Sequence, residues 1–434
     1  MNSEATQVLS RRTADIVNAS LGRRHAAERR FRLYGLISIG AGILMLVILL
    51  VSIFGKGYRA FSQTYVGLDV SFDPAVVDPD GRRSQDALAA ADYGVLLKRS
   101  LGELFPEVTE RQDKRALHRL ISAGASYAVR DELLAHPELV GGSARIWVAA
   151  GADVDMLEKG YVDRSAGEAE RRMKDRELVW VDKLKSDGRL ERRFNVKFFT
   201  AGDSREPEQA GIWGALMGSV YTVLVTLVLS LPIGVAAAIY LEEFAPRNHW
   251  VDFIEVNINN LAAVPSIVFG LLGLAVFINF FGVPRSSPLV GGLVLTLMTL
   301  PVIIIAARSA LKAVPPSIRE AAMGVGASPM QTVFHHVVPL AMPGMLTGAI
   351  IGMSRALGES APLLMIGMVA FIVDIPHGIS DPATVLPVQI YLWADSPERG
   401  FVERTSAAIL VLLAFLILMN GTAVYLRRRF ERRW

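Results

Sequence analysis

One apolar stretch of the chain carries a pair of opposite charges. Arg355 and Glu359 lie in SRALGESAPLL, inside a segment that we expect to be a membrane helix without other charges. A charge at such a depth is costly, so each group must face a partner or a water-filled cavity. The i,i+4 spacing places both on one helix face, where they can pair with each other. The alternative is an anion site, in which the forked guanidinium binds oxyanions and the carboxylate fixes its geometry.

A second pattern lies between two long apolar segments, in REAAMGVGASPMQTVFHHVVPLAMPG over residues 319–344. It predicts a helix that begins after Pro316, a glycine turn around Gly326, and a second amphipathic piece closed by Pro339 and Pro343. A compact helix pair of this kind fits a groove on another protein. The plainer interpretation is an amphipathic loop between two membrane helices.

This loop resembles the EAA loop of ABC-importer permeases. Its motif is matched by Glu320, Ala321, Ala322, Gly326 and the closing pair Val338-Pro339. At the position of His336 the family usually has an aliphatic residue. The resemblance implies that residues 315–343 carry coupling helices, which seat on cytoplasmic ATPase subunits.

Glycines and prolines mark the expected packing and bending points of other apolar segments. Gly211, Gly214 and Gly218 lie on nearly one helix face and would let another helix approach closely. A Pro-Ser pair followed by glycine interrupts the run VPSIVFG, which predicts a kink or a local unwinding. The residues concerned are Pro265, Ser266 and Gly270.

RALGESAPL resembles a segment of the PstA-type phosphate permeases, and so do VPSIVFG, GIWGALMGS and LPVQIYLWADSPERGF, together covering residues 195–434. The resemblance implies a subunit that pairs with a PstC-type permease, sits on two PstB-type ATPase subunits and receives phosphate from a periplasmic PstS-type binding protein. It also implies a substrate pathway that contains Arg355, Glu359 and Ser360. Shorter members lack most of residues 57–209, so the chain is similar to a long form.

Composition places the chain among membrane proteins, since 52% of its 434 residues are hydrophobic and only 20% are charged. The absence of cysteine excludes disulfides and thiolate metal sites. Arginines crowd both ends, which is a topology signal and weak evidence for nucleic acid, so we expect no nucleic-acid partner. No G-x-x-x-x-G-K-[ST] motif is present. ATP and Mg²⁺ are therefore expected on the partner ATPase, and no cofactor on this chain.

Hydropathy predicts an all-α polytopic membrane protein with six transmembrane helices, and the resemblance implies the type I ABC-importer permease fold. The expected spans are residues 33–54, 211–244, 257–281, 289–307, 343–373 and 405–426. A basic tail, residues 1–32, precedes the first span, and residues 210–434 form the permease domain. The positive-inside rule then places both termini in the cytoplasm of a bacterium, with the protein in the inner membrane.

A mixed α/β soluble domain is expected over residues 55–209, on the periplasmic side. Helical periodicity covers residues 96–104 and 115–134, and Arg145–Ala150 is typical of a strand. The charged segment 164–193 predicts a solvated helix with Trp180 and Leu184 on its buried side. No G-x-S-x-G or H-E-x-x-H signature occurs in this domain.

Transport of inorganic phosphate, driven by ATP hydrolysed elsewhere, is the favoured interpretation. A permease of the same architecture for sulfate or molybdate is a first alternative, because arginine binds these oxyanions in a similar way. A membrane-anchored extracytoplasmic enzyme or sensor is a second, and it would need a catalytic constellation between residues 57 and 209. The chemistry alone does not separate the oxyanions.

Overall fold

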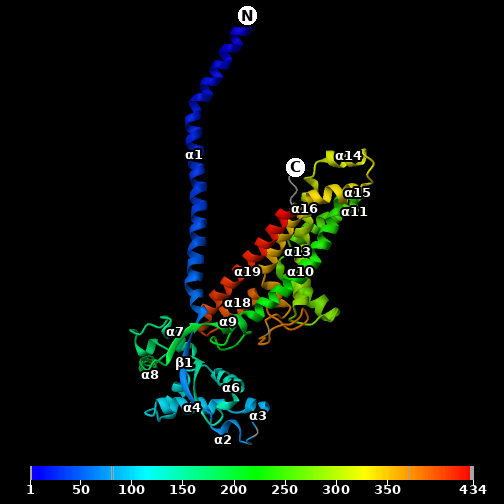
Figure 1. Ribbon diagram of the computed structural model, residues 1–434. Helices are drawn as coiled ribbons and strands as arrows, with labels where there is room; N and C mark the ends of the chain where they lie inside the picture. The colour runs from blue at the N-terminus through cyan, green and yellow to red at the C-terminus, as the bar shows by residue number, and fades with distance from the viewer. Residues whose placement is uncertain (1, 80, 82, 370, 431–434) are drawn as a thin grey trace. The chain divides into compact units, whose positions relative to one another are not determined.

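The computed structural model describes residues 2–79, 81, 83–369 and 371–430 (Figure 1). It divides into two compact units, which meet between Gly55 and Lys56. Nearly all of the first unit belongs to one helix, α1 (Asn2–Gly57), so the expected basic tail and first span are continuous. Residues Leu21–Phe61 are long and apolar enough to cross a membrane. Most of the apolar side chains between Phe31 and Phe54 are exposed, which is the arrangement that lipid or another chain would cover.

A three-stranded antiparallel sheet with the order β2-β1-β3 organises residues 58–200. A 3-10 turn, η1 (Tyr58–Phe61), leads into β1 (Ser62–Ser71), which pairs with β2 (Ser143–Ala149) and β3 (Leu190–Phe194). Val66, Leu68 and Val70 alternate along β1 and are fully buried, because successive side chains of a strand point to opposite faces. The strand expected at 145–150 is therefore confirmed as β2.

Helices pack on this sheet and give the domain a core of its own. They are α2 (Pro74–Val77), α3 (Gln85–Ala90), α4 (Tyr93–Leu104), α5 (Arg111–His118), α6 (Ala125–Ala135), η2 (Pro137–Leu139), α7 (Ala152–Glu158), η3 (Glu168–Glu170), α8 (Asp175–Ser186) and α9 (Val196–Thr200). The helix expected at 96–104 is confirmed as part of α4.

Two sequence predictions in this domain need correction. Residues 115–134 are not one helix, because the chain turns between α5 and α6 at a stretch that ends in Gly124. Within the charged segment 164–193, only α8 is a regular α-helix, and the segment ends in the edge strand β3. Trp180 and Leu184 are buried on α8 as predicted.

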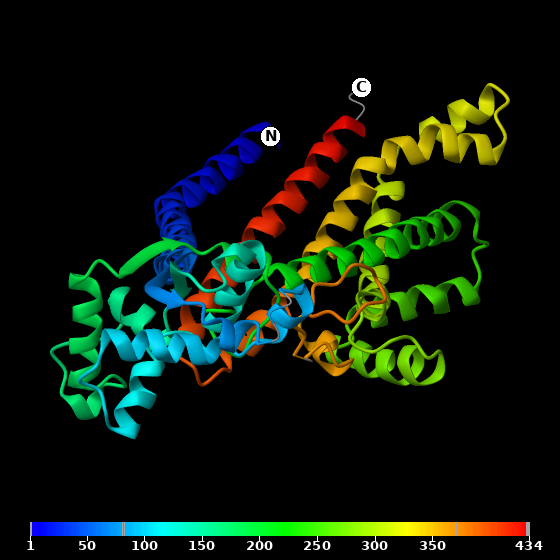
Figure 2. The same cartoon turned by 60° about the horizontal axis from the view of Figure 1, so that its bottom comes forward.

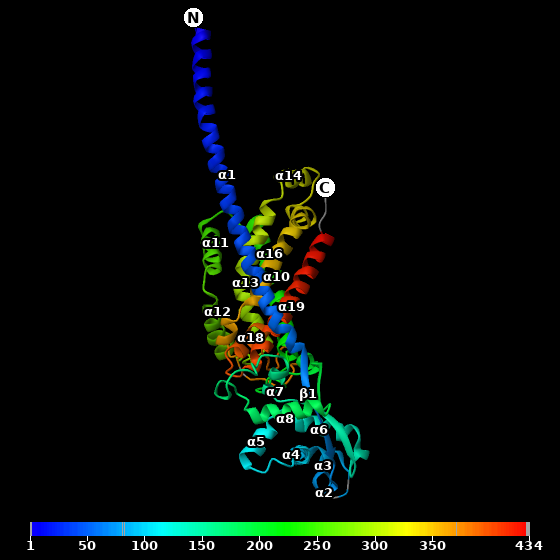
Figure 3. The same ribbon diagram turned by 90° about the vertical axis from the view of Figure 1, so that its left-hand side faces the viewer.

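Long helices lying side by side form the rest of the second unit (Figure 3). The elements are α10 (Trp213–Ile239), η4 (Tyr240–Phe244), α11 (His249–Ala262), α12 (Ser266–Leu272), η5 (Gly273–Phe280), α13 (Pro288–Lys312), α14 (Pro316–Gly324), α15 (Pro329–Thr332), η6 (Val333–Val337), α16 (Val338–Gly358), α17 (Ala361–Met365), α18 (Leu386–Ala394) and α19 (Gly400–Phe430), where η4, η5 and η6 are π-helical. Glycines let α10 and α13 approach closely, for example Gly234 against Ile303.

Among the described residues, five helices are long and apolar enough to span a membrane, or six if one bent pair counts as a span. The bent pair is α11 with α12–η5, which differ in direction by 105°. The expected third span therefore begins earlier, at His249, whereas the predicted kink or local unwinding at Pro265-Ser266 is confirmed as a sharp bend between two helices. The expected fifth span, 343–373, is also wrong at its end, because α16 stops at Gly358 and the chain folds into the short α17.

The sheet domain and the α14–α15 loop lie at opposite ends of the helix bundle (Figure 1, Figure 2). The sheet domain meets the bundle at the start of α19, whereas α14 follows the far end of α13. A bundle that crosses a membrane would thus present these two parts on different sides.

Candidate functional site

The charge pair lies at the end of α16. Arg355 is in the last turn of this helix, and Glu359 is its C-cap residue with an extended backbone, φ −82° and ψ 122°. The distance from Arg355 Nε to Glu359 Oε1 is 3.6 Å, and 45% of the Arg355 side chain and 22% of the Glu359 side chain are exposed. The prediction that both residues lie well inside a helix is wrong. Their predicted proximity is confirmed.

One of the predicted kink residues of the third apolar run, Gly270, packs against the segment that follows Glu359. Pro265 is the N-cap of α12 and Ser266 its first residue. A Cβ atom on Gly270 would lie 2.8 Å from the Cα atom and the carbonyl oxygen of Pro362 in α17. Only glycine allows this approach, so α12 fixes the chain directly after Glu359. Two motifs that are far apart in the sequence therefore build one site.

Ser360 is the N-cap residue of α17 and makes no side-chain capping bond. Its carbonyl oxygen accepts a hydrogen bond from Leu364 N at 2.9 Å. Ser360 is half-buried and directly follows Glu359 in the chain. A guanidinium and a carboxylate thus lie close together where a membrane helix ends, with a serine next in sequence.

Helix α19 supports this end of α16, which the sequence reasoning missed. Ser354 Oγ, one residue before Arg355, lies 2.7 Å from Asn420 Oδ1 of α19. Nearer the other end of α16, Arg427 Nη1 donates to Thr347 Oγ1 at 3.2 Å. A lone asparagine inside the last apolar run was the available signal, since polar groups in membrane helices bond across helices.

This site offers a charged, forked hydrogen-bond donor that the chain itself leaves partly uncovered. Arg355 is held by one carboxylate at 3.6 Å, too long for a hydrogen bond. A permanently charged guanidinium with free donors is suited to the oxygens of an oxyanion. Within the described residues, no group of three His, Asp or Glu side chains is placed to hold a metal ion.

The EAA-like loop consists of α14, a tight turn and α15. Glu320 and Ala321 are exposed on α14, whereas Ala322 is buried, with 6% exposure. Gly326 forms the turn with φ +93°, a left-handed conformation that side chains with a Cβ atom disfavour. Met323, Val325 and Met330 are exposed on α14, the turn and α15, so the loop presents an apolar surface.

The second piece of the loop does not end at its prolines. Residues Pro329–Gly358 form one 30-residue helical stretch, which includes the π-helical η6. Pro339 lies two residues after the end of η6 and Pro343 lies inside α16, so both prolines belong to the continuous helical stretch. The loop is therefore joined rigidly to the helix that carries Arg355.

Arg319 anchors the loop, although the sequence analysis gave it no role. It forms a bidentate pair with Glu243, with Nη2–Oε1 at 2.5 Å and Nε–Oε2 at 3.2 Å. It also donates to the carbonyl oxygens of Leu311 and Val314 at the end of α13. The hydrogen bond to Glu243 raises the pKa of Arg319. The signal in the sequence for this anchor was the acidic pair Glu242-Glu243, near the end of the α10–η4 helix.

The three packing glycines behave differently from each other. Gly211 precedes α10, and a Cβ atom there would lie 2.3 Å from the carbonyl oxygen of Ala201. Gly218 is helical, and its Cβ atom would lie 2.0 Å from the carbonyl oxygen of Thr384. Gly214 has looser neighbours, the nearest at 3.6 Å. Close approach is confirmed at Gly211 and Gly218. Gly218 approaches loop backbone, Gly211 approaches the C-terminal end of α9 and the residue after it, and Gly211 precedes α10 rather than lying on its face.

Comparison with known proteins places the two halves of the chain in two families. The model of the binding-protein-dependent transport system inner membrane component matches residues 230–432. A domain of unknown function, DUF3333, matches residues 18–168, which include much of α1 and most of the sheet domain. The DUF3333 match ends before α8 and β3, so the sheet domain is larger than the matched segment.

Curated relatives align with about half of this chain. The "Probable ABC transporter permease protein YqgI" of Bacillus subtilis is 31% identical over 252 residues, 54% of this chain and 85% of that protein. The "Phosphate transport system permease protein PstA 1" of Mycobacterium tuberculosis is 34% identical over 232 residues, 52% of this chain and 74% of that protein. The "Phosphate transport system permease protein PstC" of Haemophilus influenzae is 31% identical over 235 residues, 48% and 73% of the two chains.

Identity at this level over most of the relatives' length agrees with the helical bundle and the EAA-like loop. Permeases of this kind are non-catalytic, multi-pass membrane subunits, and in these systems the ATPase is a separate subunit. The chain belongs to the binding-protein-dependent permeases of ABC importers and, within them, to the PstA type, with an additional N-terminal DUF3333 domain.

Proposed function

We propose that this subunit passes inorganic phosphate from the periplasm to the cytoplasm, and that Arg355 contacts the anion on its way. The observation that carries the proposal is the Arg355 side chain, 45% exposed at the end of an otherwise apolar helix. An uncovered charge in a membrane-spanning bundle faces a water-filled path or a partner subunit. Glu359 and Ser360 lie beside it, in the segment that resembles the PstA type.

Coupling to ATP hydrolysis is proposed to run through α14 and α15. The exposed Met323, Val325 and Met330 form an apolar surface on a compact helix pair, which suits insertion into a groove of an ATPase subunit. Two PstB-type ATPase subunits would receive this loop and that of a PstC-type permease. A periplasmic PstS-type protein would deliver the substrate, and the mature complex would lie in the bacterial inner membrane.

Topology follows from the same proposal. The loop faces the cytoplasm if it meets the ATPase, so the sheet domain, at the other end of the bundle, faces the periplasm (Figure 1). The arginine-rich C-terminal end of α19 then lies inside, in agreement with the positive-inside rule. Both termini are cytoplasmic in this arrangement.

Radiolabelled phosphate uptake tests the substrate. The measurement uses cells whose only high-affinity phosphate importer contains this subunit, with unlabelled phosphate, sulfate or molybdate as competitors. We expect saturable uptake that requires the ATPase and that only unlabelled phosphate suppresses. Suppression by sulfate or molybdate at equal concentration would reassign the substrate to another oxyanion. Absence of uptake in cells with a correctly assembled complex would refute the proposal.

A further inference from the structure

A buried lysine joins the sheet domain to the last membrane helix. Lys159, the C-cap residue of α7, is fully buried, and its Nζ atom lies 2.6 Å from both Asp155 Oδ2 and Glu403 Oε1. Asp155 belongs to α7, whereas Glu403 lies in the first turn of α19. Asp155 also accepts a hydrogen bond from Thr64 N of β1 at 2.8 Å. The Lys159 ammonium group thus pairs with one carboxylate of the sheet domain and one carboxylate of the helix bundle.

The neighbouring residue of α19 makes a second buried link. Arg404 is 1% exposed, and its Nη2 atom donates to Gln63 Oε1 of β1 at 2.7 Å. Its guanidinium also lies over the Phe198 ring, 5.5 Å from the centroid. A buried charge needs hydrogen bonds or an opposite charge to offset its loss of water, and removing one partner of a buried pair costs more than removing the pair. Lys159 and Arg404 therefore fix the orientation of α19 on the sheet domain.

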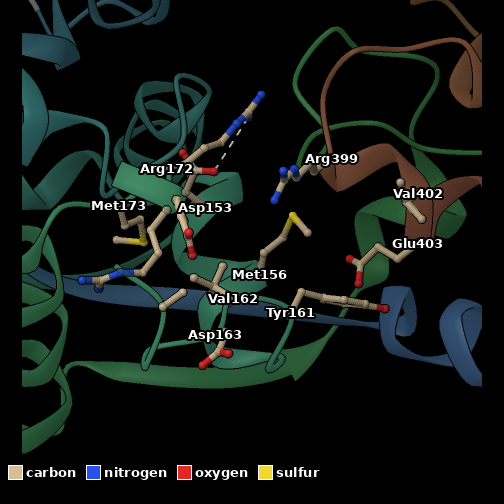
Figure 4. A pocket seen from close by; sticks show the side chains of 13 residues that line it. Asp153, Met156, Tyr161, Val162, Asp163, Arg172, Met173, Arg399, Val402 and Glu403 are labelled. Atoms are coloured by element: carbon tan, nitrogen blue, oxygen red, sulfur yellow. Dashed lines mark ion pairs between the residues drawn. The ribbon is translucent and has the colours of Figure 1, made fainter. Parts of the chain in front are cut away.

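Apolar packing is not the whole contact between the sheet domain and α19. A cavity of about 470 Å³ lies beside it, with Met156 and Tyr161 of the sheet domain facing Arg399 and Glu403 (Figure 4). Among the residues that the structure describes, none of α19 belongs to the core of the sheet domain. A separate small apolar cluster at the linkers includes Phe198 and residues of α19. The charged network therefore adds a directional polar link to the apolar packing between the sheet domain and α19.

Helix α19 connects the buried charges at Lys159 to the proposed substrate site through hydrogen bonds to α16. It bonds to α16 through Asn420 and Ser354, and Ser354 directly precedes Arg355. It bonds again through Arg427 and Thr347, two turns away on α16. A shift or rotation of α19 would thus displace the turn that holds Arg355.

We propose that the sheet domain serves as a brace, which fixes the start of α19 through Lys159 and thereby positions α16 and Arg355 for transport. The role for Arg355 rests on the proposed function, whereas the fixation of α19 does not. The brace explains why a domain without a catalytic signature is joined to this helix through buried charges rather than through a flexible linker. Lys159 and Glu403 act here as positioning residues.

The test compares the wild-type chain with Lys159→Met/Glu403→Gln in the assembled transporter. The double variant removes the carboxylate at position 403 together with its cation, whereas Asp155 loses the cation and keeps its hydrogen bond from Thr64 N. Because the chain has no cysteine, spin labels at Val179→Cys and Leu418→Cys, two exposed positions on α8 and α19, report their separation. The matched control is Arg145→Met, which removes an exposed ion pair with Asp69 in the same domain.

We expect a narrow distance distribution in the wild type and the control, and a broad one in the double variant. Initial uptake of phosphate at equal membrane level should fall by about tenfold in the double variant, within the usual range for coupling between separate sites. The single variant Lys159→Arg keeps a cation at this position. Its distance distribution and its phosphate uptake should therefore lie between those of the wild type and those of the double variant. A narrow distribution in the double variant refutes the brace. A broad distribution with normal uptake refutes the positioning of Arg355.

The two readouts also separate this inference from the proposed function. If the transporter carries another solute, the wild type itself takes up no phosphate, and the spin-label distances still decide whether Lys159 fixes α19. If phosphate is the substrate and the brace is absent, the wild type and the double variant behave alike in both measurements.

Discussion

At the scale of single residues, the geometry of Arg355 and Glu359 bears on the choice between a structural pair and an anion contact. A self-satisfied pair would be expected to be buried and closely hydrogen-bonded. The observed pair is 3.6 Å apart, and nearly half of the arginine side chain is uncovered by this chain. Such a guanidinium keeps donors free for another ligand. The anion interpretation is therefore the better supported one, and it can be tested by removing the charges singly and together.

Arg355→Gln is expected to abolish phosphate uptake, because it removes the charge and the fork that would contact the anion. Arg355→Gln/Glu359→Gln should not restore uptake, although it removes the unpaired carboxylate. Arg355→Lys keeps the charge but not the bidentate geometry, so weak uptake is expected. Uptake is measured alongside the membrane level of each variant. Near-normal uptake in the double variant would show that the two residues only neutralise each other.

Much of this residue-level chemistry could be predicted from the sequence, because charges and glycines in apolar runs are conspicuous. Arg355, Glu359 and Gly326 were singled out correctly as a close pair and a turn. Arg319 and Asn420 were not, since their roles depend on Glu243 and Ser354, which lie 76 and 66 residues away. A single sequence does not show which distant residues meet. The contacts that hold a site in place are therefore harder to predict than the site itself.

At the scale of elements, the second half of the α14–α15 loop and the helix that carries Arg355 form one continuous helical stretch. The stretch Pro329–Gly358 runs from α15 to the charge pair without a break in helical structure. The sequence suggested a break at Pro339 and Pro343, but a proline in a helix can be accommodated when a π-helical turn precedes it. Movement of the loop on an ATPase would thus be transmitted along the helix to Arg355.

Gly326→Val should uncouple the loop without unfolding the bundle. A β-branched side chain at φ +93° costs about 1–3 kcal/mol locally, and the position lies outside the apolar helices. The variant should insert in the membrane but no longer co-purify with its ATPase. Gly324→Val is the matched control, because no atom lies near its Cβ position and its φ is not left-handed. Normal assembly of the Gly326 variant would favour the plain loop interpretation.

Arg319→Gln should release α14 from the end of the bundle. It leaves Glu243, 9% exposed, without its bidentate partner, and a broken pair of this kind costs about 2–5 kcal/mol. Thermal unfolding of the purified complex and proteolysis of the loop should both show the loss. Arg319→Gln/Glu243→Gln should recover part of the stability. An unchanged melting temperature in the single variant would mean that the pair contributes nothing to the loop's position.

At the scale of the whole molecule, the sequence predicted the order of the parts better than the shape of each. An N-terminal helix, a mixed domain and a helical permease region occur where expected. Helix ends were misplaced, because hydropathy does not record where a chain leaves the apolar layer as a short helix such as α17 or bends by 105° between α11 and α12. Tertiary contacts such as Gly270 against Pro362 decide those points.

Paired reporter insertions test the proposed topology as a whole. One reporter is inserted at Gly142, an exposed turn before β2, and a second at Val325, which is 87% exposed in the α14–α15 turn. Exposed turns tolerate insertion, so the fold should survive both changes. Because the two turns lie at opposite ends of the bundle, a reporter that works only outside the cytoplasm should be active at Gly142 and silent at Val325. Activity at Val325 alone would reverse the orientation and remove the loop from reach of a cytoplasmic ATPase. Activity at both positions would mean that the bundle does not separate them across a membrane.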